Sequence, residues 1–165
     1  MKTPRLGTLA TLLFLFPALV PTAAGADPAA HGEHIMVEAD KLVWKDNPTL
    51  PPGARIAIIE GNPKEAGLFA FRLKFPAGYR IPPHEHPVTG HVTVLAGTFH
   101  IAVGDRFDAT SGDAVPTGGY SLMPANTQHY AWADGETIIQ IHGLGPWGIK
   151  YVNATDDPRT AAGSR

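Results

Sequence analysis

The 165-residue chain contains no cysteine. This absence excludes disulfide bonds, thiolate metal ligands and cysteine nucleophiles together. A metal ion bound to this protein would therefore be held by histidine nitrogens and by oxygen ligands.

The chain also lacks basic runs and long apolar stretches in its main part. Lysine and arginine number 13 against 15 acidic residues, which gives a formal net charge of −2. No basic run is available to bind phosphates, so nucleic acid is not an expected partner. After residue 26, no apolar stretch reaches the roughly 20 residues that a spanning helix needs, so the mature chain is expected to stay out of the membrane.

The N-terminus has the three-part layout of a secretory signal peptide. Lys2 and Arg5 precede an apolar stretch, and the small residues of Ala24-Gly25-Ala26 follow it. A retained membrane anchor is the alternative, but prolines interrupt the apolar stretch, which is too short to span a bilayer. We expect residues 1–26 to be removed on export to the periplasm or the medium. Residues 27–165 are then expected to form one domain with its own core.

The remainder consists of short strand patterns between turns. Its 18 glycines and 16 prolines bound runs in which apolar and polar residues alternate. In residues 68–75, for example, Phe69, Phe71, Leu73 and Phe75 share one face, which predicts a half-buried strand. Similar runs occupy residues 54–60, 91–103, 119–125, 128–133 and 137–145. Many short strands indicate an all-β sandwich or barrel. The small, polar residues after Tyr151 are expected to form a loose tail.

Three of the eight histidines are placed as metal ligands would be. His84 and His86 stand two residues apart, so on a strand both rings would point to the same face. Such a pair is also common among ordinary exposed histidines. His129 lies far along the chain, and antiparallel strands of a barrel could bring it to the same inner face.

At these positions the sequence resembles the cupin superfamily. The first cupin motif is matched by Gly78, His84, His86 and Gly97, and the second by Gly118, Pro124 and His129. The resemblance implies a double-stranded β-helix, or jelly-roll barrel, over roughly residues 55–152. It also implies that His84, His86 and His129 bind one divalent transition metal ion. Iron(II) is the first choice, and zinc, manganese, nickel and copper also suit imidazole ligands.

Three motif positions depart from the family pattern. Asn126 replaces a glycine, and asparagine tolerates the left-handed backbone that a tight turn can require. Ala133 replaces an asparagine. The glutamate that is usually the fourth ligand is replaced by Gly90. His91 is a candidate fourth ligand: strand alternation puts it on the opposite face, whereas a β-bulge at Gly90 would turn it inward. If the site has three ligands, Gly90→Glu is expected to tighten metal binding.

A three-histidine site leaves coordination positions for a substrate, as catalytic sites do. This arrangement is similar to that of the cupin thiol, gentisate and diketone dioxygenases, so the chain is expected to be an oxidoreductase of that type acting on a small molecule. A non-catalytic periplasmic cupin that binds or senses a metal or ligand is the main alternative. A barrel whose metal site has decayed is a third.

Other side chains are expected to surround the metal site, pack on the barrel or line the pocket. His91, Gln140 and His142 are candidates to orient a substrate beside the metal. Tyr130 and Trp132 have the opposite parity to His129 and are expected to pack on the outer side of the barrel or against the partner in a homodimer. Trp147 is expected to anchor the core or a lid. Apolar pocket walls are expected from Phe71, Leu73, Val92 and Val94.

Overall fold

The computed structural model describes residues 34–162, and the predicted signal peptide (residues 1–26) lies outside the described residues. The described chain is built mainly of strands, with three short helical segments. In chain order these are η1 (Ala39–Lys41), β1 (Lys45–Asp46), β2 (Arg55–Glu60), β3 (Gly67–Phe75), β4 (Arg80–Glu85), β5 (Gly90–Ala96), β6 (Thr98–Val103), β7 (Asp113–Pro116), β8 (Tyr120–Met123), β9 (His129–Ala133), β10 (Thr137–Gly145), β11 (Lys150–Tyr151), η2 (Ala154–Asp156) and α1 (Pro158–Ala162). No helix in residues 34–162 has the length and apolar character needed to cross a membrane.

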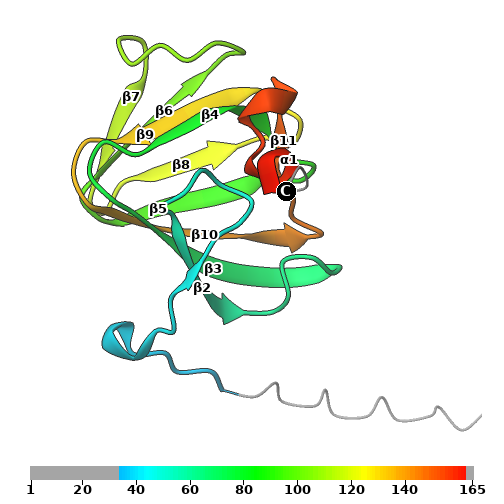
Figure 1. Ribbon diagram of the computed structural model, residues 1–165. Coiled ribbons are helices and arrows are strands. Elements are labelled where there is room, and N and C mark those ends of the chain that lie inside the picture. Colours follow the sequence, from blue (N-terminus) through cyan, green and yellow to red (C-terminus); the bar gives the residue numbers. More distant parts are fainter. Residues whose placement is uncertain (1–33, 163–165) are drawn as a thin grey trace, which may run out of the picture. The chain divides into compact units, whose positions relative to one another are not determined.

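The strands form two antiparallel sheets. One has the order β1-β2-β3-β10-β5-β8 and the other β11-β4-β9-β6-β7. Figure 1 shows the two sheets facing each other, with β3, β10 and β5 in one wall and β4, β9 and β6 in the other. The chain crosses repeatedly between the sheets, because β3, β5, β8 and β10 belong to the first sheet and β4, β6, β9 and β11 to the second. This arrangement confirms the all-β barrel expected from the sequence.

The longest alternating runs became the central strands. Residues 68–75 lie in β3, residues 91–103 form β5 and β6, and residues 137–145 form β10. As alternation requires, the four predicted apolar residues of β3 are buried, and Arg72 and Lys74 are only partly so. The short strands β1, β7 and β11 had no such pattern to reveal them.

The core is a cluster of apolar side chains between the sheets. Phe75 is completely buried, and its ring stacks on Tyr79 and Phe99 with centroid distances of 4.9 and 5.8 Å. Phe69, Phe71 and Leu73 belong to the same cluster. Apolar burial of this kind supplies the main favourable free energy of folding.

The motif glycines stand where the backbone is left-handed. Gly78 and Gly97 have φ of +71° and +78°, a region that side chains other than glycine rarely adopt. A Cβ atom on Gly97 would also lie 2.5 Å from the carbonyl oxygen of Glu136. Asn126 has φ of +57°, so asparagine does adopt the left-handed turn expected at this position.

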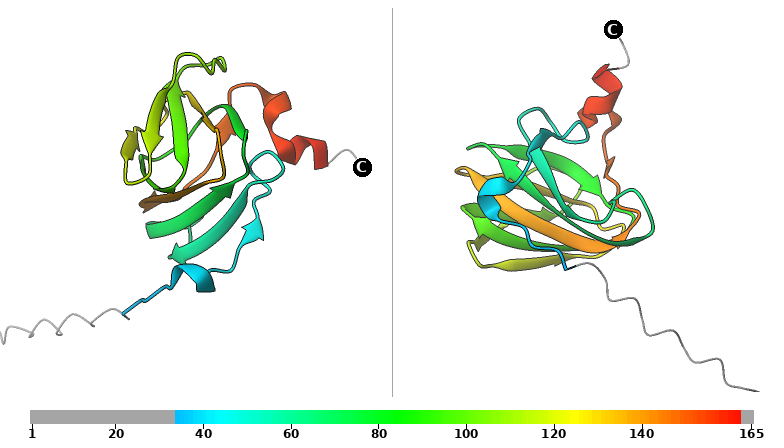
Figure 2. Two further views of the ribbon diagram at one scale, coloured as in Figure 1. Left: turned by 90° about the vertical axis from the view of Figure 1, so that its left-hand side faces the viewer. Right: turned by 90° about the horizontal axis from the view of Figure 1, so that it is seen from below.

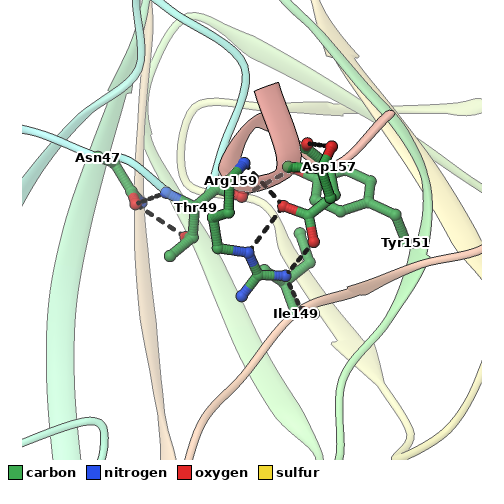
Figure 3. Close-up of polar contacts among 7 residues, drawn as sticks. Asn47, Thr49, Ile149, Tyr151, Asp157 and Arg159 are labelled. Atoms are coloured by element: carbon green, nitrogen blue, oxygen red, sulfur yellow. Dashed lines mark hydrogen bonds and ion pairs between the residues drawn. The ribbon is translucent and has the colours of Figure 1, made fainter. Parts of the chain in front are cut away.

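Residues 152–162 make defined contacts where a loose tail was expected. The Tyr151 hydroxyl donates to the Thr49 carbonyl oxygen at 2.9 Å, and in both views of Figure 2 the red C-terminal segment lies beside the cyan loop before β2. Figure 3 shows Arg159 paired with Asp157 and donating to the carbonyl oxygen of Ile149. The small, polar composition of residues 152–162 did not indicate these contacts, because they depend on where the folded barrel places Thr49 and Ile149.

A second aromatic cluster covers the outer side of the five-stranded sheet. Tyr130 and Trp132 are 2 % and 8 % exposed and pack with Phe107, which belongs to the loop between β6 and β7. His100 stacks on Trp132 and hydrogen-bonds to Asp134 at 2.7 Å. These aromatic rings therefore pack outside the barrel, on a loop of the same chain.

Candidate metal centre

Three histidines meet between β4 and β9. His84 lies near the end of β4, His86 follows that strand, and His129 begins β9 directly opposite His84. Each ring offers a nitrogen within 4.8 Å of the others. The side chains are only 3 %, 8 % and 4 % exposed for His84, His86 and His129. The two motifs, far apart in sequence, are thus joined by strand pairing.

Hydrogen bonds fix the same tautomer in all three rings. The Nδ1 atoms of His84, His86 and His129 lie 2.7, 2.6 and 2.9 Å from the carbonyl oxygens of Pro82, Gly148 and Thr127. A carbonyl oxygen can only accept, so each Nδ1 carries the proton and donates. Each Nε2 therefore keeps a lone pair, and carbonyl partners of this kind orient metal-binding imidazoles. The cluster fits one divalent metal ion held by three neutral nitrogens.

Burial keeps these imidazoles neutral. Desolvation lowers the pKa of His86 to about 3. It also lowers the pKa of His84 well below its usual range, with further lowering from His129 and His86, and it lowers that of His129. Protons therefore compete weakly for these nitrogens in the folded protein near neutral pH.

The apoprotein should lose stability as the pH falls below about 6.5, the pKa of an unperturbed histidine. Below that pH the histidines of the unfolded chain bind protons, whereas those of the folded protein stay neutral because their pKa values are lowered. The free energy of unfolding therefore decreases as the pH falls. Each imidazole contributes up to about 1.4 kcal/mol per pH unit until its own lowered pKa is reached. Urea unfolding of chelator-treated protein between pH 7.5 and 4.5 measures the slope. His86→Gln should make it shallower, and a wild-type slope of zero over this range would contradict the prediction.

The three histidines line one part of an apolar cavity between the sheets. Its volume is about 720 Å³, within the usual range for small-molecule sites. No aspartate or glutamate of residues 34–162 lines it. Val94, expected in the wall, is buried in the core instead. The apolar walls include Phe71, Leu73, Val92, Met123, Ile139, Ile141 and Trp147.

His91 lies away from the cluster. Gly90 pairs with Met123 and His91 with Leu122 in unbroken register, so there is no bulge at this point. Gly90 and Val92 point inward and are buried, whereas His91 alternates to the outer face. Its Nδ1 lies 2.6 Å from the Tyr120 hydroxyl. Of the two predicted positions for His91, the structure therefore has the outer face, away from the three histidines.

Gln140 and His142 are not brought to the cavity either. They alternate along β10 with Ile139 and Ile141, which do line it. Gln140 accepts from Arg72 at 3.1 Å, and the His142 ring stacks on His91 with centroids 4.9 Å apart. The placement expected for these two side chains is therefore corrected to the outer face of the six-stranded sheet.

A family model described as the ChrR cupin-like domain matches residues 32–148, most of the chain. The chain belongs to the ChrR cupin-like domain family. No curated protein matches it. The cupin resemblance is thereby confirmed, together with the jelly-roll fold.

Solved structures similar to this ChrR cupin-like chain share its fold at low sequence identity. A proposed acetylacetone dioxygenase of Methylibium petroleiphilum PM1 is 22 % identical, with a TM-score of 0.59 over 76 % of this chain and 85 % of that one. The polyketide cyclase RemF of Streptomyces resistomycificus is 14 % identical, with a TM-score of 0.61 over 79 % and 94 %. Salicylate 1,2-dioxygenase of Pseudoaminobacter salicylatoxidans is 13 % identical, with a TM-score of 0.50 over 62 % and 30 %.

Proposed function

We propose that the protein is a metal-dependent oxygenase of the three-histidine dioxygenase type, which binds one Fe(II) ion through His84, His86 and His129. The observation that carries this proposal is the set of three buried imidazoles with fixed tautomers beside an apolar cavity. When bound, the ion would bring substrate and oxygen together. The chain's own groups position the ion, exclude water and shape the cavity.

The charge of the site favours an anionic substrate. Three neutral imidazoles leave the charge of a divalent ion uncompensated, and no carboxylate of the described chain lines the cavity. An unbalanced charge in an apolar cavity is costly, so a ligand that supplies an oxygen or sulfur anion is stabilised there. Enolates, phenolates and thiolates of small molecules have this chemistry. Two of the similar folds belong to a proposed and a named dioxygenase, which is consistent with this proposal.

Export is part of the proposal. The basic, apolar and small-residue order of residues 1–26 supports a cleaved signal peptide and a periplasmic or secreted protein. Mass spectrometry of the protein from its native location should find Asp27 as the first residue.

Oxygen uptake tests the proposed activity. Protein purified without a histidine tag and loaded anaerobically with Fe(II) would be mixed with catechols, β-diketones and thiols in an oxygen electrode. We expect one class to be consumed with one O₂ per molecule, and His129→Ala to abolish the uptake. Tight binding of Fe(II) without uptake for any class would favour the non-catalytic binding or sensor protein instead.

A further inference from the structure

Trp147 stands at the metal centre in a place that neither motif predicts. Its indole lies over the His86 ring, with centroids 3.9 Å apart and planes 26° from parallel. Phe69 and Phe71 also pack against it, at centroid distances of 5.6 and 6.0 Å. Its backbone N–H donates to the carbonyl oxygen of Pro63 at 2.6 Å. The indole is thus packed between a candidate ligand and the core, and it forms part of the cavity wall.

The same indole explains the glycine at position 90. A Cβ atom on Gly90 would lie 2.9 and 3.0 Å from Cη2 and Cζ3 of Trp147, distances so short that the indole would have to shift to admit it. Gly90 is buried on the inward face of β5, and its φ is not in the left-handed region. Its backbone therefore gives no reason for glycine, which weakens a strand. The reason is the space that the Trp147 ring occupies.

We infer that Gly90 and Trp147 are a matched pair: the indole fills the space of a fourth protein ligand and offers a flat apolar wall to the molecule that shares the metal. This inference deepens the proposed function, because it assumes that the three histidines hold a metal. The absence of the motif glutamate at Gly90 then belongs to a three-ligand site with an aromatic wall. It is not damage to a four-ligand site. The substrate class that fits is a small anionic donor with a planar, apolar body.

This pairing changes the result expected for Gly90→Glu. From the sequence alone, the added carboxylate was expected to tighten metal binding. With Trp147 in place, the new side chain collides with the indole, so the single variant should melt at a lower temperature and bind Co²⁺ no more tightly than wild type. In the Trp147→Ala background the collision is absent. There, Gly90→Glu should tighten Co²⁺ binding by about tenfold or more, since a carboxylate joins the ligands.

The test is a double-mutant cycle over Gly90→Glu and Trp147→Ala, with Co²⁺ affinity and melting temperature as readouts. Gly135→Glu is the matched control, because a Cβ there meets nothing within 4 Å and the residue is exposed. It should change neither readout. If Gly90→Glu does not fold, Gly90→Ala, which adds only the Cβ atom, replaces it in the melting-temperature comparison. Equal effects of the position-90 change in both backgrounds would overturn the pairing.

The aromatic wall is tested with two chelators that share one metal-binding head. Benzohydroxamate should bind Co²⁺-loaded wild type about three- to tenfold more tightly than acetohydroxamate, through packing on the indole. Trp147→Phe should keep this preference and Trp147→Ala should lose it. An unchanged preference in Trp147→Ala would refute the wall. Failure of wild type to bind Co²⁺ would instead refute the proposed function, and the melting temperatures would still decide the steric pairing.

Discussion

Replacement of His84 by alanine is expected to lower the affinity for Fe(II) or Co²⁺ by more than about 100-fold, because loss of groups that merely orient a metal ligand already costs about 10- to 100-fold. His84 faces His129 across the β4–β9 pair, and its ring centroid lies 4.2 Å from that of His129 and 4.9 Å from that of His86. Alanine removes one of three nitrogen donors, and no carboxylate lining the described cavity can replace it. His129→Ala should have an effect of the same size.

His91→Ala and His142→Ala are the matched controls for this loss. Both remove an imidazole from the same domain, but from the outer face of the sheet. Each should leave metal affinity within about twofold of wild type. Equilibrium dialysis against Co²⁺ at pH 7.5, with circular dichroism to check the fold, gives the comparison. A loss in His91→Ala as large as that in His84→Ala would show that the ligand set differs from the one described.

Phe75→Ala is expected to have the opposite profile, with a large cost in stability and none in metal binding. The Phe75 side chain is fully buried between Tyr79 and Phe99, and it does not line the cavity. Truncation of such a side chain leaves a void and costs about 3–5 kcal/mol. Urea unfolding should show this decrease in the free energy of unfolding, while Co²⁺ affinity of the folded protein stays within about twofold of wild type.

Leu144→Ala is the control for this second prediction. Its side chain is 64 % exposed on β10, so its removal should change stability by no more than about 0.5 kcal/mol. A loss below about 1 kcal/mol in Phe75→Ala, or a parallel loss of metal affinity, would contradict the separation of core and site.

Local patterns predicted the barrel and the histidine cluster because both depend on alternation and motif spacing. Alternation along β5 places Gly90 and Val92 inward and His91 outward, as the structure has them. The same reasoning, applied to β10, would have placed Gln140 and His142 outside, since the inward positions are held by Ile139 and Ile141. The alternation in the sequence therefore indicates an outer position for both polar side chains.

Other features had no local signal. Trp147 follows the last long strand in the irregular segment Gly-Pro-Trp-Gly, which has no periodicity, and its contact with Gly90 joins segments that are distant in sequence. The order of the C-terminal segment likewise depends on a hydrogen bond from Tyr151 to Thr49, which are 102 residues apart. Such contacts form only once the two sheets have come together, so local sequence patterns do not indicate them.

X-ray absorption of the Fe(II)-loaded, tag-free protein tests the central claim most directly, because imidazole ligands give a characteristic multiple-scattering signal. We predict one iron per chain with three imidazoles and light oxygen or nitrogen atoms in the remaining positions, and loss of this signal in His84→Ala. Iron bound without imidazole, or an unchanged spectrum in His84→Ala, would contradict a metal centre built from His84, His86 and His129.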